Sequence, residues 1–314
     1  MTLRYALWLM GVVFCSPGTL FGATGSIETQ DGRTRTYTID KPSVSDPKRL
    51  MPVIIMLHGG GGDDDTAKTM TGLSDAALPK GFMVVYPNGT GKFERIKKLK
   101  TWNAGHCCGY AMDSAVDDVG FIDMLIDQLI SKEGADPARI FVTGMSNGAM
   151  LTHRVGARLC HKIAAIAPVV GGLFGDEKVP KCATSVLTIN GALDYSVPLE
   201  GGLSQGRAAS AWDGTPLKAA SYQGAFWAKA NGCDPVPDKS DQKDVSVTHY
   251  RCPKGIDVIR YVVAQGGHAW PGGRKGSSRG DTPTQTLDAT QLIIQFFEEH
   301  PRGAARVPSP ASAH

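Results

Sequence analysis

Three side chains that can perform nucleophilic catalysis together each lie in a loop that follows an apolar run. Ser146 lies within Gly144-Met-Ser-Asn-Gly148, Asp194 within Gly191-Ala-Leu-Asp-Tyr-Ser-Val-Pro198, and His268 among glycines at 266–273. A serine hydroxyl is a weak nucleophile near neutral pH, so it needs a base within hydrogen-bond reach and a third group that orients this base. We therefore expect Ser146 to act as nucleophile, His268 as general base and Asp194 as the acid that orients the base.

The pattern Gly-x-Ser-x-Gly does not select Ser146 by itself, because it also surrounds Ser204 and Ser278. Only Ser146 follows a strand-like apolar run and precedes a segment with helical apolar spacing, which is the strand-turn-helix pattern of a nucleophile elbow. Ser204 follows turn residues, and Ser278 is surrounded by charged residues with no apolar run. We expect these two serines in solvated loops.

The order serine, aspartate, histidine along the chain is the order found in α/β-hydrolases. Three other histidines are weaker candidates for the base. His106 lies in a cysteine-containing loop, His153 on the helix expected after Ser146, and His249 within a predicted strand. We therefore keep His268 as the expected base.

An apolar run at 53–57 is followed at once by His58 and four glycines. Glycines let the backbone approach a ligand closely and direct its N–H groups at the ligand. In a hydrolase with this layout, one N–H of the loop and the N–H after the nucleophile form the oxyanion hole. We expect Gly60 and Asn147 in these positions, and we expect His58 to hydrogen-bond within its own loop.

Aromatic residues flank the expected site at three places. Trp102 begins a loop rich in glycine and cysteine, Tyr195 follows Asp194, and Trp270 lies two residues after His268. We expect all three to line the substrate pocket. For the loop at 102–110, a structural role as a loop stapled by its cysteines is the alternative.

Strand and helix patterns alternate along the chain, which predicts a single α/β domain with one doubly wound, mainly parallel sheet, the α/β-hydrolase fold. The strands are expected at 34–39 (an edge strand), 53–57 (a central strand), 81–86, 140–143, 163–170, 185–189 and 257–263. The helices are expected at 66–78, at 119–130, directly after Ser146, and at 287–300. Asp117 and Asp118 precede the second of these helices and are expected as its N-cap and first-turn charge.

The two ends of the chain differ in composition from its middle. Arg4 precedes a short apolar stretch at 5–15, which predicts a secretory signal peptide over 1–25. We expect a catalytic domain at 26–300 and a disordered Pro/Ala/Ser-rich tail at 301–314. The expected location is secreted, either extracellular or periplasmic, with no membrane attachment after signal cleavage. The net charge of +3 gives no reason to expect a nucleic-acid partner.

Six cysteines remain after the expected signal peptide, an even number that suits an oxidising compartment. Cys233 and Cys252 bracket a polar excursion and form the simplest pair. The other four are Cys107, Cys108, Cys160 and Cys182. They allow either a Cys107–Cys108 bridge with a Cys160–Cys182 bridge, or two long-range bridges. No cysteine or histidine spacing matches a zinc site, and we expect neither a metal nor an organic cofactor.

Several motifs together resemble the secreted esterase family of polyhydroxybutyrate depolymerases and feruloyl esterases. They are Leu57-His-Gly-Gly-Gly, Cys108-Gly followed by Asp117-Asp-Val-Gly-Phe, Gly144-Met-Ser-Asn-Gly-Ala-Met, Cys182 ahead of Asn190-Gly-Ala-Leu-Asp-Tyr-Ser-Val-Pro, and Gly267-His-Ala-Trp-Pro-Gly. The likeness runs from about Gly32 to Phe297. It implies an α/β-hydrolase fold and carboxylic ester hydrolysis, with Ser146, Asp194 and His268 as the catalytic residues. Asn190 departs from the family, which commonly has histidine there.

This resemblance implies three classes of substrate. They are polyesters of hydroxyalkanoic acids such as polyhydroxybutyrate, hydroxycinnamoyl (feruloyl) esters on plant polysaccharides, and acetylated xylan. We expect an esterase for a polyester or a feruloylated polysaccharide, with an acetylxylan or other carbohydrate esterase as the alternative. A non-catalytic carbohydrate-binding protein on the same fold is the remaining alternative.

Overall fold

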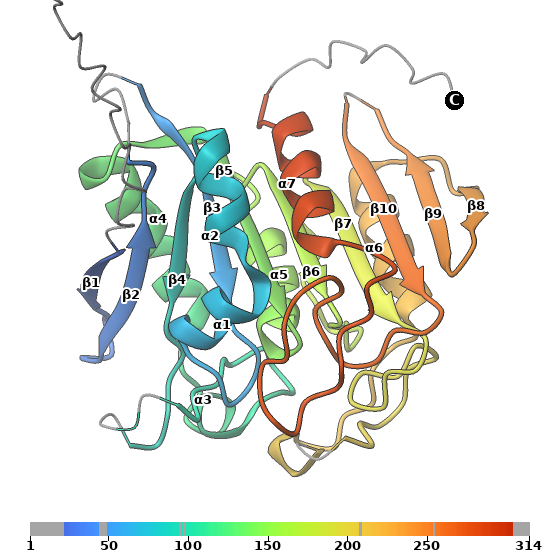
Figure 1. Ribbon diagram of the computed structural model, residues 1–314, viewed down its shortest axis with the longest axis horizontal. Coiled ribbons are helices and arrows are strands. Elements are labelled where there is room, and N and C mark those ends of the chain that lie inside the picture. The colour runs from blue at the N-terminus through green and yellow to red at the C-terminus, as the bar shows by residue number, and fades with distance from the viewer. Residues whose placement is uncertain are drawn as a thin grey trace, which may run out of the picture.

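The computed structural model describes residues 22–43, 49–93, 96, 98–206, 209–253 and 255–303, and these residues form one ten-stranded sheet with helices on both faces (Figure 1). The strands are β1 Gly22–Glu28, β2 Thr34–Asp40, β3 Met51–Leu57, β4 Met83–Pro87, β5 Ala135–Met145, β6 Ala165–Val169, β7 Ser185–Gly191, β8 Asp238–Gln242, β9 Val245–Arg251 and β10 Asp257–Val263. The helices are α1 Asp64–Thr71, α2 Leu73–Ala77, α3 Gly109–Asp113, α4 Asp118–Lys132, α5 Asn147–Arg158, α6 Ala220–Asn231 and α7 Ala289–Glu299, with 3₁₀ turns η1 Leu78–Lys80 and η2 Ala209–Ala211.

The middle of the sheet is parallel and its two sides are antiparallel. The order is β1-β2-β4-β3-β5-β6-β7-β10-β9-β8. The six central strands, β4, β3, β5, β6, β7 and β10, run parallel to one another. On one side β2 pairs antiparallel with β4 and β1 antiparallel with β2, and on the other side β9 pairs antiparallel with β10 and β8 antiparallel with β9. The predicted doubly wound, mainly parallel sheet is therefore confirmed.

Apolar side chains of the central strands pack on both faces of the sheet. In β3, Val53, Ile55 and Leu57 join the core cluster that also contains buried residues of α4, α5 and α6. Ile54 and Met56 join the opposite cluster, which contains buried residues of α1, α2 and α7 (Figure 1). Burial on both faces explains why this strand is a continuous apolar run without polar alternation.

This topology brings distant loops to one edge of the sheet. Strands β3, β5, β7 and β10 are all parallel, so the loops after them all leave at their carboxyl ends. In open α/β sheets, ligands bind outside this edge. The loops that carry Gly60, Ser146, Asp194 and His268 are those four loops.

Two predicted elements differ from the structure. Strand β2 is not an edge strand, because β1 pairs with it along its length, from Gly22 opposite Asp40 to Glu28 opposite Thr34. The helix expected at 66–78 is broken at Gly72, which has a left-handed φ of 61° and separates α1 from α2. Glycine adopts this conformation without steric cost and commonly ends helices.

Helix α6 and strand β8 are among the elements that the sequence-based prediction lacks. Helix α6 contains Gly224, and the apolar positions around its axis form no clear stripe. Strand β8 is exposed along its whole length, so no apolar alternation marks it. Both elements contact neighbouring elements of the sheet: β8 pairs with β9, and α6 packs on β7 and β10.

Part of each predicted terminal segment lies outside the described residues. Residues 1–21 of the expected signal peptide and 304–314 of the expected tail are not described, whereas 22–25 form the first half of β1. Within the described part of the chain, no helix has the length and apolar content needed to cross a bilayer.

The start of α4 is held by both aspartates expected there. Asp117 is the N-cap and accepts a hydrogen bond from the Gly120 N–H at 2.9 Å. Asp118 is buried, pairs with Arg35 of β2 at 2.7 Å, and accepts the Asn103 N–H at 2.7 Å. Burial raises the pKa of the Asp118 carboxyl, and the Arg35 guanidinium opposes this rise. The pair thus ties a sheet strand, α4 and the loop at 101–108 together.

Three disulfides cross-link the described residues. They are Cys107–Cys108, Cys160–Cys182 and Cys233–Cys252. The predicted Cys233–Cys252 pair is confirmed. Of the two arrangements left open for the other four cysteines, the adjacent pair with Cys160–Cys182 is present and the two long-range bridges are not. Closing chain segments of 22 and 19 residues stabilises the fold by about 3 kcal/mol each in the chain-entropy model.

A buried polar network connects α5, α6 and β7. Trp227 donates its indole N–H to His153 Nδ1 at 3.0 Å, so His153 carries its proton on Nε2 and donates it to Gln223 Oε1 at 2.9 Å. Gln223 in turn donates to the Gly171 carbonyl at 3.0 Å, and Asn190 donates to the same carbonyl at 3.1 Å. Burial lowers the pKa of His153 to about 4, consistent with a neutral ring.

We predict that His153 makes the protein less stable in acid. In the native state the ring stays neutral down to about pH 4, whereas its ordinary pKa is 6.5. Between these values the unfolded chain binds more protons, so the free energy of unfolding falls as pH falls, by up to about 1.4 kcal/mol per pH unit for this group. Urea unfolding from pH 7.5 to 4.5 measures the slope.

His153→Gln should reduce this slope by the contribution of one proton. His161→Gln, at an exposed position, controls for the loss of a histidine as such. Equal slopes in the two variants would contradict the prediction.

Candidate active site

The turn at Ser146 has a strained backbone conformation and lies between two closely packed glycines. Ser146 lies between β5 and α5 with φ 57° and ψ −121°. A Cβ on Gly144 would lie 2.6 Å from the backbone of Gly148, and a Cβ on Gly148 would overlap the backbone of 57–58. Holding a non-glycine residue at positive φ costs about 1–3 kcal/mol. The two glycines of Gly-x-Ser-x-Gly are therefore required by packing, and the turn directs the serine side chain out of the sheet.

The loops that carry Asp194 and His268 are joined backbone to backbone. They come after β7 and β10, which are adjacent and parallel, with Val263 paired to Gly191. The Ala192 N–H donates to the Val263 carbonyl at 3.0 Å, and the Leu193 N–H donates to the Gly266 carbonyl at 2.8 Å. These main-chain contacts fix the acid loop against the histidine loop independently of their side chains.

The three side chains expected to act together form a continuous hydrogen-bonded row. His268 Nε2 lies 2.8 Å from Ser146 Oγ, and His268 Nδ1 lies 2.8 Å from Asp194 Oδ2. Asp194 is buried, and its other carboxylate oxygen accepts the N–H groups of Ser196 and Val197 at 2.8 Å each. With Asp194 ionised, Nδ1 carries the proton, and Nε2 is left to accept the hydroxyl proton of the serine.

The histidine loop has an additional anchor that was not predicted from the sequence. The main-chain N–H of His268 donates to Asp281 Oδ2 at 2.7 Å. Gly267 packs so closely on this carboxylate that a Cβ there would lie 2.6 Å from Asp281 Oδ2. Asp281 lies 13 residues further along, in a stretch of Gly, Ser, Thr and Pro. No spacing or periodicity in that stretch marks it.

The two residues whose N–H groups are expected to form an oxyanion hole lie next to each other. Asn147 is the first residue of α5, so its N–H has no acceptor within the helix. Among the described residues, the Gly60 N–H has no hydrogen-bond acceptor either, whereas the Gly61 N–H donates to the Lys100 carbonyl and the Gly62 N–H to the Gly59 carbonyl. A Cβ on Gly60 would lie 3.7 Å from the Asn147 Cβ, so the two backbones are adjacent.

His58 supports the glycine loop from below. It is fully buried, its Nε2 accepts the Gly89 N–H at 2.9 Å, and its Nδ1 donates to the Gly59 carbonyl at 2.8 Å. Burial lowers the pKa of His58 to about 4, so the ring is neutral. The expectation that His58 hydrogen-bonds within its loop is confirmed.

Trp102, predicted to line the substrate pocket, is not among the residues that line the cavity beside Ser146. Its side chain has no exposed surface, and the indole N–H donates to the His58 carbonyl at 2.9 Å. The backbone of Trp102 pairs with the side chain of Asn147, donating to its Oδ1 at 2.7 Å and accepting from its Nδ2 at 3.0 Å. Trp102 therefore connects the glycine loop after β3 to Asn147 at the start of α5. This is a structural role, the alternative given for the loop at 102–110.

A cavity of about 410 Å³ opens beside Ser146 and His268. Its apolar lining comes from Ala67 and Met70 of α1 together with Met145, Ala269 and Trp270. Trp270 is buried, and its indole N–H donates to Thr290 Oγ1 of α7 at 3.0 Å. It therefore lines the cavity and also connects the histidine loop to α7. Tyr195 is not among the lining residues and is 68% exposed, so the structure does not place it in this cavity.

The competing serines and histidines lie in other environments. In the described part of the chain, neither Ser204 nor Ser278 forms a hydrogen bond with a histidine, although Ser278 lines the cavity. His106 is paired with Asp213 at 2.7 Å, and His249 is paired with Asp257 at 2.9 Å. These contacts leave His268 as the histidine beside the serine of the elbow.

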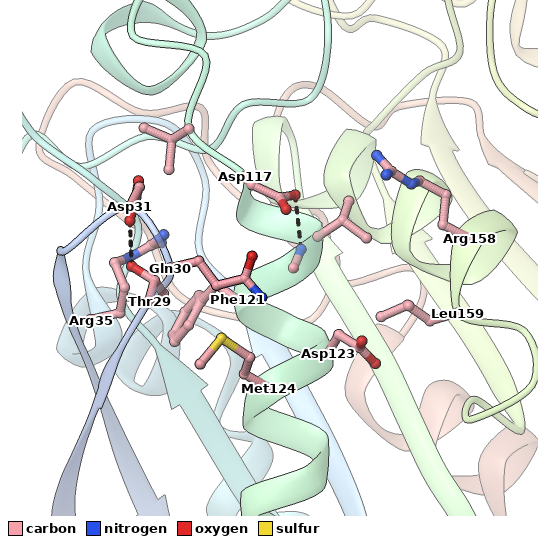
Figure 2. A pocket seen from close by; sticks show the side chains of 13 residues that line it. Thr29, Gln30, Asp31, Arg35, Asp117, Phe121, Asp123, Met124, Arg158 and Leu159 are labelled. Atoms are coloured by element: carbon pink, nitrogen blue, oxygen red, sulfur yellow. Dashed lines mark hydrogen bonds between the residues drawn. The ribbon is translucent and has the colours of Figure 1, made fainter.

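A larger hollow, of about 640 Å³, lies between the β1–β2 turn and α4 (Figure 2). Its acidic residues are occupied by local contacts. Asp31 accepts hydrogen bonds from Thr29 and Arg33, and Asp117 caps α4. No serine, cysteine or histidine is among its lining residues, so the nucleophile and base required for the expected chemistry are found only at the other cavity of these two.

The fold and this arrangement define the α/β-hydrolase class, and sequence comparison identifies the family. The family described as esterase PHB depolymerase matches residues 36–200, just over half of the 314-residue chain. The chain belongs to this family. The matched range contains Ser146 and Asp194 and ends before His268.

Characterised relatives share only part of their length with the chain. Feruloyl esterase B from Piromyces equi is 28% identical over 249 residues, which cover 77% of this chain and 44% of that protein. Poly(3-hydroxyalkanoate) depolymerase C from Paucimonas lemoignei is 24% identical over 274 residues, which cover 78% of this chain and 63% of that protein. The chain thus spans less than two thirds of the length of each of these two relatives.

A solved structure supports the fold assignment. The acetyl xylan esterase from Aspergillus awamori superposes with a TM-score of 0.54 at 16% identity, covering 79% of this chain and 94% of that one. At this identity the similarity concerns the fold alone. The α/β-hydrolase fold predicted from the sequence is confirmed.

Proposed function

We propose that the protein is a serine carboxylic ester hydrolase that works through an acyl-enzyme on Ser146. The observation that carries this proposal is the hydrogen-bonded row from Ser146 Oγ through His268 to Asp194, with both contacts at 2.8 Å. A buried carboxylate, an oriented imidazole and a serine on a strained turn are the parts that nucleophilic catalysis at neutral pH requires.

In the first half of the reaction, Ser146 Oγ attacks the carbonyl carbon of the ester while His268 Nε2 takes the hydroxyl proton. Asp194 stabilises the imidazolium that forms and keeps Nδ1 protonated. The tetrahedral intermediate then collapses, and the bond between the carbonyl carbon and the alcohol oxygen breaks. His268 returns its proton to this oxygen, so a neutral alcohol leaves and the acyl group stays on Ser146.

In the second half, a water molecule repeats the attack on the acyl carbon. His268 Nε2 takes one proton from the water, and a second tetrahedral intermediate forms. Its collapse breaks the bond to Ser146 Oγ, which recovers a proton from His268. The carboxylic acid leaves, and the serine, the neutral imidazole and the carboxylate are restored.

The negative oxygen of both tetrahedral intermediates is stabilised by hydrogen-bond donors that are already in position before the reaction. We assign the N–H groups of Asn147 and Gly60 to this role. The side chain of Asn147 is hydrogen-bonded to the backbone of Trp102 on both its oxygen and its nitrogen, which supports a fixed position for its main-chain N–H. Each such donor typically contributes about 10²–10³ in rate.

We propose a polyester or a hydroxycinnamoyl ester as the substrate, with an acetylated polysaccharide as the alternative. Support comes from the names of the relatives, which are a feruloyl esterase, a poly(3-hydroxyalkanoate) depolymerase and, by fold, an acetyl xylan esterase. The apolar part of the cavity lining suits an acyl chain or an aromatic ring better than a bare acetyl group.

The test of this function uses the repeated serine motif as its own control. Ser146→Ala should lower kcat for 4-nitrophenyl butyrate by about 10⁴–10⁶ without unfolding the protein. Ser204→Ala, in the second Gly-x-Ser-x-Gly, should retain full activity. Far-UV circular dichroism checks the fold of both variants. Retained activity in folded Ser146→Ala would exclude the assignment and favour a non-catalytic protein.

The same three proteins also separate the substrates. Release of ferulate from methyl ferulate, clearing of a polyhydroxybutyrate suspension and release of acetate from acetylated xylan are measured in parallel. A substrate counts only if the unmodified protein and Ser204→Ala cleave it and Ser146→Ala does not. Acetate release alone would overturn the polyester and hydroxycinnamoyl assignment in favour of the alternative.

We also propose that the protein is exported, with a signal peptide within the predicted range 1–25 that ends close to the start of β1 at Gly22. Support comes from the predicted apolar segment near the N-terminus and from three disulfides, which persist in oxidising compartments. Mass spectrometry of the protein recovered from its native host should find, outside the cytoplasm, an N-terminus between about residues 22 and 26. Recovery of the uncleaved chain from the cytoplasm with free thiols would contradict export.

A further inference from the structure

Two positively charged side chains line the same cavity as Ser146 and His268. They are Arg274 and Lys98, and both are exposed. Elsewhere on the surface, cations such as Arg154 and Lys162 pair with aspartates. Within the described residues, neither Arg274 nor Lys98 forms an ion pair. These two charges are therefore available to something that enters the cavity.

Arg274 is held at the cavity by its backbone. Its N–H donates to the Met70 carbonyl at 2.9 Å, and the preceding Gly273 N–H donates to the Trp270 carbonyl at 3.1 Å. A Cβ on Gly273 would lie 2.9 Å from the Trp270 ring, so this part of the loop packs closely. Arg274 comes six residues after His268 on the same loop, and these main-chain contacts fix the position of its backbone beside the cavity.

The charge of the cavity lining is positive on balance. Asp281 is the one acid among its lining residues, and one of its oxygens already accepts the His268 N–H. Arg274 and Lys98 carry two positive charges, and Asp281 carries one negative charge that is already hydrogen-bonded, so the cavity favours an anionic ligand group. A planar guanidinium binds a carboxylate through two parallel hydrogen bonds, which a lysine ammonium does not reproduce.

Apolar side chains also line the cavity that contains Ser146 and these two cations. Met70, Ala67 and Trp270 form this part of the lining. A substrate that fits all three features has its ester at Ser146, a short apolar spacer over these residues, and a negative group at the rim. A neutral ester satisfies only the first two.

We propose that the cavity selects esters that carry a carboxylate a few bonds from the scissile ester, with Arg274 as the principal carboxylate-binding residue and Lys98 as the second. The inference rests on the proposed ester hydrolase function. Such a carboxylate occurs on the alcohol side, as at the acid end of a hydroxyalkanoate oligomer, or on the acyl side, as in a half-ester of a dicarboxylic acid. Both sources present the same chemistry to Arg274.

Matched acid and amide pairs test the proposal, because the amide keeps the shape and removes the charge. On the alcohol side the pair is 3-(butyryloxy)butanoate and its primary amide. On the acyl side the pair is 4-nitrophenyl hemiglutarate and 4-nitrophenyl glutaramate. In at least one pair, the acid should have the higher kcat/KM by about 3- to 10-fold at low ionic strength, mainly through KM, and 0.5 M NaCl should reduce this preference. The pair that shows this preference identifies whether the recognised carboxylate lies on the alcohol side or on the acyl side of the ester.

Variants assign the preference to the proposed residues. Arg274→Gln should bring the acid-to-amide ratio of kcat/KM close to one, and Lys98→Gln should lower it by a smaller factor. Lys275→Gln is the matched control, since Lys275 is the exposed neighbour of Arg274 and is not among the cavity-lining residues. It should keep the ratio of the unmodified protein.

The outcomes separate this inference from the proposed function. Hydrolysis of both members of each pair with ratios near one would overturn the carboxylate proposal and leave the esterase standing. A preference that survives in Arg274→Gln and in the double variant with Lys98→Gln would also overturn it. Absence of hydrolysis of all four compounds and of 4-nitrophenyl butyrate would instead overturn the esterase function itself.

Discussion

The site depends on one imidazole that bridges a hydroxyl and a buried carboxylate. His268 contacts Ser146 on one side and Asp194 on the other at the same distance, 2.8 Å. This placement is imposed by the backbone, because β7 and β10 are adjacent parallel strands, and the loops after them hydrogen-bond to each other. The carboxylate in turn is immobilised by two main-chain N–H groups, so its charge is oriented before a substrate arrives.

The surrounding structure maintains backbone positions that would not persist alone. Ser146 has a positive φ, and close packing of Gly144 on Gly148 leaves no room for a relaxed turn. Buried hydrogen bonds hold the loops behind the site. Trp102 donates to the His58 carbonyl and to the Asn147 side chain, and Asp118 accepts the Asn103 N–H. A polar group buried without such a partner costs about 1–3 kcal/mol, so these contacts restrict each loop to one arrangement.

Local pattern and chain order made the parallel strands and the position of the serine predictable from the sequence. Apolar runs such as 53–57 marked the strands, and the surroundings of Ser146 separated it from Ser204. The features that escaped prediction depend on tertiary contact. Asp281 lies in a stretch without periodicity, β8 has no apolar face, and Trp102 is buried because its loop folds beneath the glycines. An aromatic residue near a site has the same sequence signal whether it faces a ligand or the core.

The central claim is that His268 and Asp194 activate Ser146. Covalent trapping of the serine is the most direct test of this claim. The folded protein is incubated with diisopropyl fluorophosphate, digested, and mapped by tandem mass spectrometry. One phosphoryl adduct per chain is expected, on the peptide that contains Ser146, with the adduct lost when His268 is replaced by alanine or when the protein is unfolded in urea before treatment. A folded protein that stays unmodified, or that is modified at Ser204 instead, would contradict the account.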